Sequence, residues 1–166
     1  MALIHTGYLE YAELADIQKL PSAERFRKGP VAVIECVQEI PCNPCETACR
    51  FGAINIKTPI TNIPVLVEEK CVGCGLCVSK CPGLAIFIVD LSYSETEAKV
   101  SFPYEYTPIP KKGDKVKAVN RCGEVICEAI VKDVKNPPSF DHTPVVTIEV
   151  PIAFADQARS IQRGKP

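Results

Sequence analysis

The sequence predicts an α+β protein made of three segments. These are an N-terminal helical arm over residues 1–30, a cysteine-rich unit of short strands and helices over residues 31–95, and a C-terminal antiparallel β-module over residues 96–166 that ends in a short helix. Three observations predict this organisation. Eight of the ten cysteines lie between residues 36 and 81, apolar residues of the arm recur at helical spacing, and from about residue 97 apolar and polar residues alternate as in half-buried strands.

The overall composition excludes several functional classes. The 166 residues carry a formal net charge of -1 with a pI of about 6.1, so no basic surface for nucleic acid or an anionic membrane is indicated. The apolar runs are strand-sized, and the N-terminus lacks a basic segment followed by an apolar core. We therefore expect a cytoplasmic protein without a membrane segment. In that reducing compartment, ten cysteines favour metal binding over disulfides.

The arm contains two short helical patterns. In "YLEYAELADIQKL" the apolar residues follow helical spacing, and "PSAERFRKGP" has the Ser and Pro signals of a second short helix or turn. Neither segment is long enough to form its own core. We expect the arm to pack on the cysteine-rich unit or on another protein.

The second cysteine group is the more specific one. "CVGCGLCVSKCP" places Cys71, Cys74, Cys77 and Cys81 before Pro82, which is the spacing of a bacterial iron-sulfur loop whose fourth cysteine binds a different cluster. Two glycines, at positions 73 and 75, suit a loop that needs positive backbone angles and close approach of N–H groups to sulfur.

The first cysteine group repeats the second. "VAVIECVQEIPCNPCETACRFGAINI" and "VLVEEKCVGCGLCVSKCPGLAIFIVD" each contain a strand, a cysteine, a C-x-x-C-x-x-x-C segment and another strand. The alignment matches Cys36, Cys42, Cys45 and Cys49 with the four cysteines of the second group. The first loop is three residues longer, and Arg50 stands where the second copy has Pro82.

On these motifs, residues 31–90 resemble a bacterial two-cluster 4Fe-4S ferredoxin domain. The resemblance implies crossed ligation, with one cluster held by Cys36, Cys42, Cys45 and Cys81, and the other by Cys71, Cys74, Cys77 and Cys49. Two alternatives stay open. The first cluster could be a three-iron type or carry another ligand if Cys36 does not bind, and the C-x-x-C pairs at 42/45 and 71/74 could together hold structural zinc.

The C-terminal segment predicts a small antiparallel β-barrel or sandwich of four or five strands. Turn-forming stretches separate its alternating runs, and a hairpin is expected over residues 115–134. The tail "PIAFADQARSIQRGKP" predicts a helix near Ala155 that covers the barrel. Cys122 and Cys127 lie in the hairpin, where we expect ordinary packing or chance to account for them, and a third metal site completed by ligands from outside the hairpin stays an alternative.

The chain shows no catalytic constellation and no nucleotide fingerprint of its own. About a hundred residues surround the sixty-residue cluster unit, which favours a docked electron-transfer subunit of an oxidoreductase over a free carrier. The phrases "GPVAVIECVQEIPCNPCETAC" and "CPGLAIFIVD" are similar to small iron-sulfur subunits of FAD-dependent amine or amino-acid dehydrogenases of anaerobic bacteria.

That resemblance implies a flavoprotein partner that holds FAD, together with an external electron acceptor or donor. Two other classes stay open. One is a free-standing soluble ferredoxin that serves several enzymes, and the other is a redox-sensing module whose "KKGDKVKAV" segment contacts RNA or protein.

Overall fold

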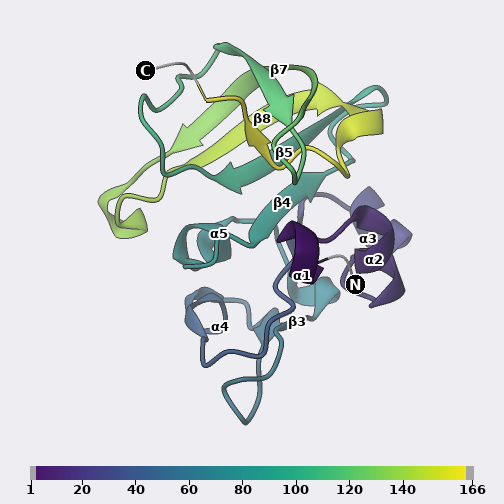
Figure 1. Cartoon of the computed structure of the whole chain (residues 1–166), viewed down its shortest axis with the longest axis vertical. Coiled ribbons are helices and arrows are strands. Elements are labelled where there is room, and N and C mark those ends of the chain that lie inside the picture. The colour runs from purple at the N-terminus through teal and green to yellow at the C-terminus, as the bar shows by residue number, and fades with distance from the viewer. Residues whose placement is uncertain (1–2, 164–166) are drawn as a thin grey trace.

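The computed structural model describes residues 3–163 and is built around one open antiparallel sheet (Figure 1). The order of the seven strands is β1-β4-β5-β8-β7-β6-β9, and a separate two-stranded ribbon pairs β2 with β3. The predictions for residues 1–2 and 164–166 lie outside the described part of the chain. The strands are β1 (Val31–Ile34), β2 (Ile54–Asn55), β3 (Val65–Leu66), β4 (Ile86–Asp90), β5 (Glu97–Pro103), β6 (Lys115–Val119), β7 (Val125–Lys135), β8 (Val145–Pro151) and β9 (Ser160–Ile161).

The two sequence repeats form two similar structural units. The first runs through β1, helix α4 (Pro44–Ala48) and β2, and the second through β3, helix α5 (Leu76–Lys80) and β4. The outer strands β1 and β4 pair antiparallel from Val31↔Val89 to Ile34↔Ile86, and the inner strands β2 and β3 form the small ribbon. The repeat predicted from the sequence is therefore present as a nested pair of strand-helix-strand units.

The alternation predicted for the C-terminal segment is confirmed as antiparallel strands. Alternate side chains of β5 and β8 are fully buried, as are Ala118 on β6 and Val131 on β7. The predicted hairpin is β6 with β7, which pair from Lys115↔Ile130 to Val119↔Val125. These strands form the larger of the two hydrophobic cores.

The strands do not close into a barrel, which corrects one of the two architectures expected from the sequence. Strand β5 pairs on one side with β8 and on the other with β4 of the cysteine-rich unit. A strand has only two edges, and both edges of β5 are thereby occupied within one open sheet. The sheet thus continues across residue 95, and Figure 1 shows β4 lying between α5 and the strands of the C-terminal segment. The division into separate domains stays a prediction.

The helix predicted near Ala155 is wrong. The tail makes a single 3-10 turn, η3 (Ile152–Phe154), and then enters β9, where Ile161 pairs with Ala118 of β6. The edge of β6 offers unpaired backbone groups, and the tail satisfies them: Arg159 N–H donates to Val119 O at 2.9 Å and Gln162 N–H to Lys117 O at 2.8 Å. Pairing with this edge replaces the helix.

The arm forms three short helices, α1 (Leu3–Thr6), α2 (Tyr11–Asp16) and α3 (Ala23–Arg27). Leu9 and Leu14 are buried, whereas Ile17 of the expected apolar stripe is 39% exposed. Ser22 caps α3 by accepting a hydrogen bond from Arg25 N–H at 3.1 Å. The remaining 3-10 turns are η1 (Glu68–Lys70) and η2 (Pro138–Phe140). The expected packing of the arm is confirmed, because Lys19 Nζ donates to Pro64 O at 2.8 Å and Ser22 binds the Glu68 carboxylate.

Candidate iron-sulfur centre

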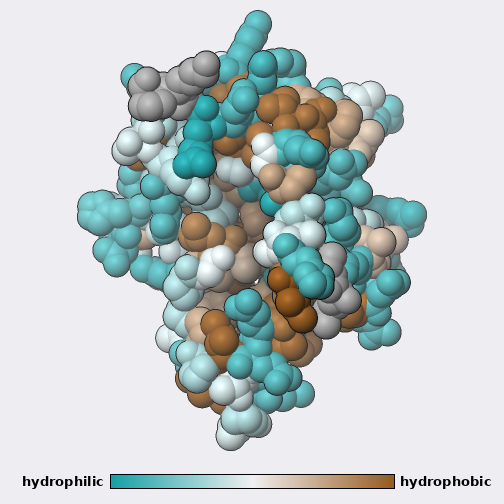
Figure 2. Space-filling model, viewed as in Figure 1, coloured by the Kyte–Doolittle hydropathy of each residue, from teal (hydrophilic) through white to brown (hydrophobic). Residues whose placement is uncertain are grey.

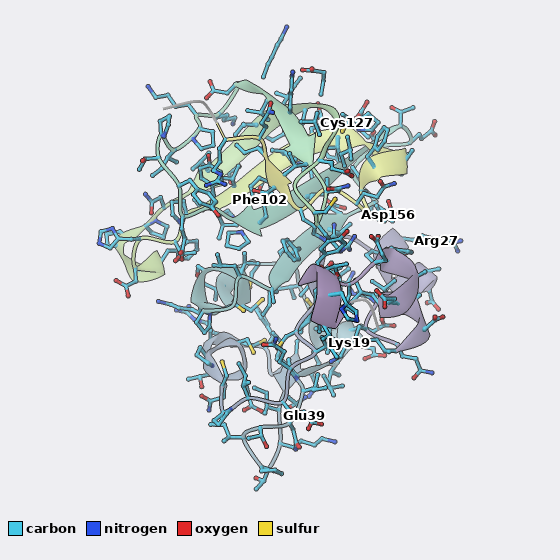
Figure 3. All side chains as sticks on the ribbon, viewed as in Figure 1. Lys19, Arg27, Glu39, Phe102, Cys127 and Asp156 are labelled. Carbon is cyan, nitrogen blue, oxygen red and sulfur yellow. The ribbon has the colours of Figure 1, made fainter. Side chains whose placement is uncertain are left out.

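Two small cavities lie beside α4 and α5, and four cysteines line each of them. Yellow sulfur atoms gather around these two helices in Figure 3. The first cavity is lined by Cys36, Cys42, Cys45 and Cys81, and the second by Cys49, Cys71, Cys74 and Cys77. Each cavity therefore takes three cysteines from one repeat and the last cysteine from the other. All eight sequence-predicted site residues line one cavity or the other, while their role as ligands stays a prediction.

The two C-x-x-C pairs line different cavities. Cys42 and Cys45 face the first, and Cys71 and Cys74 face the second. A single zinc ion held by both pairs does not fit this separation. Each cavity instead offers four soft sulfur donors to one group, which is the donor set that iron-sulfur clusters use.

Helices α4 and α5 position the last cysteine of each repeat in the same way. Cys49 and Cys81 follow the ends of the two helices with closely similar backbone angles, φ -79° and ψ 95° for Cys49 and φ -80° and ψ 109° for Cys81. Ala53 N–H donates to Cys49 Sγ at 3.3 Å, and Ala85 N–H donates to Cys81 Sγ at 3.4 Å. The replacement of the proline by Arg50 in the first copy therefore leaves the conformation of the preceding cysteine unchanged.

The loop before α5 depends on two glycines. Gly75 has a φ of 82° at the start of the helix, and Gly73 has a φ of 65°. A Cβ at Gly73 would lie 2.6 Å from Pro30, so the loop passes directly against the residue that precedes β1. Ala32 N–H of β1 also donates to Cys71 Sγ at 3.4 Å. The positive backbone angles that the sequence predicted for these two glycines are therefore observed.

One buried cysteine in each cavity, Cys45 in the first and Cys77 in the second, lies in an environment that disfavours an uncompensated negative charge. Burial raises the pKa of Cys77 to about 12, and the nearby Cys71, Cys74 and Cys49 add to the effect. Burial likewise raises the pKa of Cys45 to about 11, and the nearby Cys81, Cys42 and Cys36 add to the effect. Four thiolates that line one small cavity repel one another unless a cation lies among them, and the iron ions of a cluster supply that charge. The donor set in each cavity therefore fits a 4Fe-4S cluster.

Arginine side chains at two places outside the cysteine motifs support this region, and the sequence did not reveal them. The Glu35 carboxylate, next to Cys36, accepts hydrogen bonds from Arg121 at 3.0 and 2.6 Å and from Arg159 at 2.7 Å. Burial opposes ionisation of Glu35, but the hydrogen bonds and charges of the two guanidiniums outweigh it and hold its pKa below the ordinary value. Burial lowers the pKa of Arg159 while Glu35 opposes that change, and a guanidinium stays protonated in proteins.

Arg25 of α3 binds near the second cavity. Within residues 3–163, its guanidinium donates to four backbone carbonyl oxygens, one of which is Cys71 O at 2.6 Å. At both places the contacts join residues that are far apart in the sequence. Arg25 and Cys71 are separated by 46 positions, and Glu35 and Arg159 by 124. No local pattern could have identified them.

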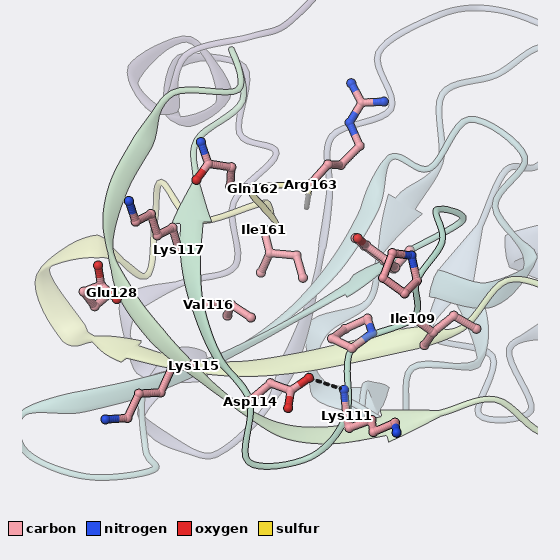
Figure 4. Close-up of a pocket in the computed structure, with 13 residues that line it drawn as sticks. Ile109, Lys111, Asp114, Lys115, Val116, Lys117, Glu128, Ile161, Gln162 and Arg163 are labelled. Atoms are coloured by element: carbon pink, nitrogen blue, oxygen red, sulfur yellow. Dashed lines mark hydrogen bonds between the residues drawn. The ribbon is translucent and has the colours of Figure 1, made fainter. Parts of the chain in front are cut away.

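A separate, larger groove lies on the C-terminal part of the sheet (Figure 4). Its charged lining is mixed, since Lys111, Lys115 and Lys117 lie with Asp114 and Glu128. Asp114 accepts a hydrogen bond from Lys111 N–H at 2.7 Å, drawn as a dashed line. None of the residues lining this groove is a cysteine, so it is distinct from the two cysteine cavities.

Comparisons with known proteins identify the same region. A family model described as a 4Fe-4S binding domain matches residues 64–87, which include β3, α5 and the start of β4. An uncharacterized ferredoxin of Methanocaldococcus jannaschii is 36% identical over 73 residues, which cover 43% of this chain and 44% of that protein.

Two further relatives match over smaller shares of their own length. The polyferredoxin-like subunit of an aliphatic sulfonate oxidoreductase of Pyrococcus furiosus is 46% identical over 48 residues, covering 29% of this chain and 27% of the subunit. A translation initiation factor of Schizosaccharomyces pombe is 33% identical over 97 residues, covering 48% of this chain and 16% of the factor. The chain thus spans less than half the length of each of these relatives.

Together these matches support a ferredoxin-type iron-sulfur domain that binds a 4Fe-4S cluster and an electron-transfer role for it. Within residues 3–163, no helix has both the length and the apolar character needed to cross a membrane.

Proposed function

We propose that this chain holds two 4Fe-4S clusters and serves as the electron-transfer subunit of a larger oxidoreductase. Cys36, Cys42, Cys45 and Cys81 would bind one cluster, and Cys49, Cys71, Cys74 and Cys77 the other. The observation that carries the proposal is the crossed lining of the two cavities, in which each repeat contributes its last cysteine to the cavity of the other repeat.

A 4Fe-4S cluster, when bound by four thiolates, exchanges single electrons and has no open position for a substrate. The residues of this chain define the surroundings of each cluster. Backbone N–H groups of Ala32, Ala53 and Ala85 donate to cysteine sulfurs, and such donors stabilise negative charge there. Burial of Cys45 and Cys77 limits the access of water.

The second cavity has the more open side. Cys74 is exposed, whereas the other seven cysteines of the two cavities are buried or half-buried. Phe51 and Val72, which line the same cavity, are 49% and 50% exposed. Hydrophobic side chains also reach the surface in the lower part of the molecule, below the sheet (Figure 2). An apolar surface beside the more exposed cysteine suits contact with an electron-transfer partner.

The partner is proposed to be a flavoprotein that holds FAD and oxidises an amine or amino acid. This assignment rests on the resemblance of the two sequence phrases quoted above. The relative from Pyrococcus furiosus supports the coarser part of the proposal, since that protein is by its description a subunit of an oxidoreductase.

Anaerobic purification of the chain from its native cell tests the proposal. We expect a stable, stoichiometric complex with a flavoprotein, and FAD that remains with the partner after the subunits are separated. A monodisperse protein of 18.1 kDa with its clusters intact would refute the subunit assignment and favour a free ferredoxin.

A second candidate function is a cluster-bearing module that binds RNA or protein. The similarity to a translation initiation factor and the lysines of the separate groove favour it. Retention of the loaded protein on RNA or on ribosomal particles, lost when Lys115 and Lys117 are changed to Gln, would support this candidate. Rapid reversible reduction without such retention would support electron transfer.

A further inference from the structure

Arg25 links the helical arm to the loop that begins the second cysteine motif. Its Nη2 atom donates to Cys71 O at 2.6 Å and to Pro30 O at 2.8 Å. Its Nη1 atom donates to Gly29 O at 3.0 Å, and its Nε atom donates to Glu68 O at 2.9 Å. One guanidinium thus joins the chain before β1 to the chain before Cys71.

The arm holds Arg25 in this position through a second contact. Ser22, at the start of α3, donates from its N–H and its hydroxyl to the Glu68 carboxylate at 2.7 and 2.6 Å. Glu68 begins the 3-10 turn that ends at Lys70, directly before Cys71. The start of α3 is therefore fixed to the same turn that Arg25 binds at its first residue, Glu68, and directly after its end, at Cys71.

The contacts made by Arg25 restrict Cys71 from two sides. Its carbonyl oxygen is bound by Arg25, and its sulfur accepts the N–H of Ala32, the second residue of β1. The loop after Cys71 passes against Pro30, which Arg25 also binds. With 9% of its surface exposed, Arg25 brings a positive charge into a largely buried place beside the second cavity.

We propose that Arg25 is a positioning residue for the cluster of the second cavity, and that its charge raises the reduction potential of that cluster. Reduction adds an electron, and a nearby buried cation stabilises the more negative state. The effect is confined to one cluster because the contacts of Arg25 lie on the Cys71 side. This inference rests on the proposed ligation by Cys71.

The test compares the wild type with Arg25→Gln, Arg25→Lys and a matched control, Arg27→Gln. Arg27 lies on the same helix and carries the same charge, but it is exposed and extends outward from α3 in Figure 3. The potentials of both clusters are measured by redox titration followed by EPR. A Cys74→Ser variant, which alters a residue of the second cavity only, assigns the two signals.

We expect Arg25→Gln to shift the oxidised-to-reduced equilibrium of the second cluster about tenfold toward the oxidised form, a fall of about 59 mV for one electron. The first cluster and both clusters of Arg27→Gln should keep the wild-type potentials. Arg25→Lys keeps the charge but cannot reproduce the four contacts. Its second cluster should keep a near-wild-type potential but lose iron to a chelator faster than the second cluster of the wild type does.

The outcomes separate this inference from the proposed function. A wild type without two 4Fe-4S clusters would refute the proposed function. A wild type with both clusters, together with an Arg25→Gln protein whose two potentials are unchanged, would refute only the assignment to Arg25. If Arg25→Gln does not fold, Arg25→Lys decides, and a second cluster that loses iron at the wild-type rate would overturn the positioning role.

Discussion

Replacing Glu35 by Gln should weaken the attachment of the C-terminal tail to the cysteine-rich unit. The carboxylate is 11% exposed and lies between Arg121 and Arg159, whose side chains are 7% and 5% exposed. Gln keeps the size of the side chain but removes its charge. Two buried guanidiniums would then face each other without the carboxylate that lies between them.

The expected cost follows from this burial. Breaking a buried ion pair by removing one partner costs about 3–5 kcal/mol. Both arginines keep partners among backbone carbonyls, since Arg121 donates to Asp156 O at 2.9 Å and Arg159 to Ala158 O at 2.7 Å. We therefore expect a loss near the lower end, about 3 kcal/mol.

Native-state amide hydrogen exchange measures this loss locally, because cluster loss prevents a reversible two-state unfolding experiment. The reporting amides are Arg159 N–H and Gln162 N–H, which tie β9 to β6. When β9 separates from β6, Arg159 leaves its buried position. Loss of the Glu35 charge makes that position less favourable, so β9 should separate more often. A loss of about 3 kcal/mol corresponds to exchange that is about 100-fold faster.

The matched control is Glu24→Gln, which removes an equally direct pair with Lys28 at 2.6 Å. Those side chains are 76% and 64% exposed, so solvent screens their attraction and exchange at β9 should not change. Exchange in Glu35→Gln that stays within threefold of the wild type would contradict the role assigned to the buried pair.

Three further outcomes are expected. Changing Cys36 to Ser should damage the first cluster selectively and leave about four of about eight irons, whereas survival of both clusters would show that the repeat alignment is wrong at that position. The two clusters should have unequal potentials because the first loop is three residues longer, and EPR titration that shows two indistinguishable clusters would count against this. Gly73→Ala should lose iron from the second cluster, because the added Cβ would lie 2.6 Å from Pro30 and the positive φ costs about 1–2 kcal/mol more. The control, Gly113→Ala, has the cost of a positive φ but no such clash, so this protein should keep its iron.

The elements that the sequence predicted well are those specified by local patterns. The period-two alternation identified the buried faces of the C-terminal strands, because side chains on successive residues point to opposite sides of a sheet. The cysteine repeat identified the paired strand-helix-strand units, since both copies retain the same spacing within the C-x-x-C-x-x-x-C segment. Ser22 identified the start of α3 through its capping preference.

The features that the sequence did not predict depend on pairing between distant segments. Alternation predicts strands but not their order, so it could not show that β5 lies between β4 and β8. The tail around Ala155 has helical spacing, yet the free edge of β6 pairs with it as a strand. The arginine contacts to Glu35 and Cys71 join residues 86 and 46 positions apart and leave no trace in local spacing.

The most direct test of the central proposal is iron and acid-labile sulfide analysis of anaerobically prepared protein. Two 4Fe-4S clusters predict about eight irons and about eight sulfides per chain. A colourless protein that contains zinc in place of iron and sulfide would contradict the proposal.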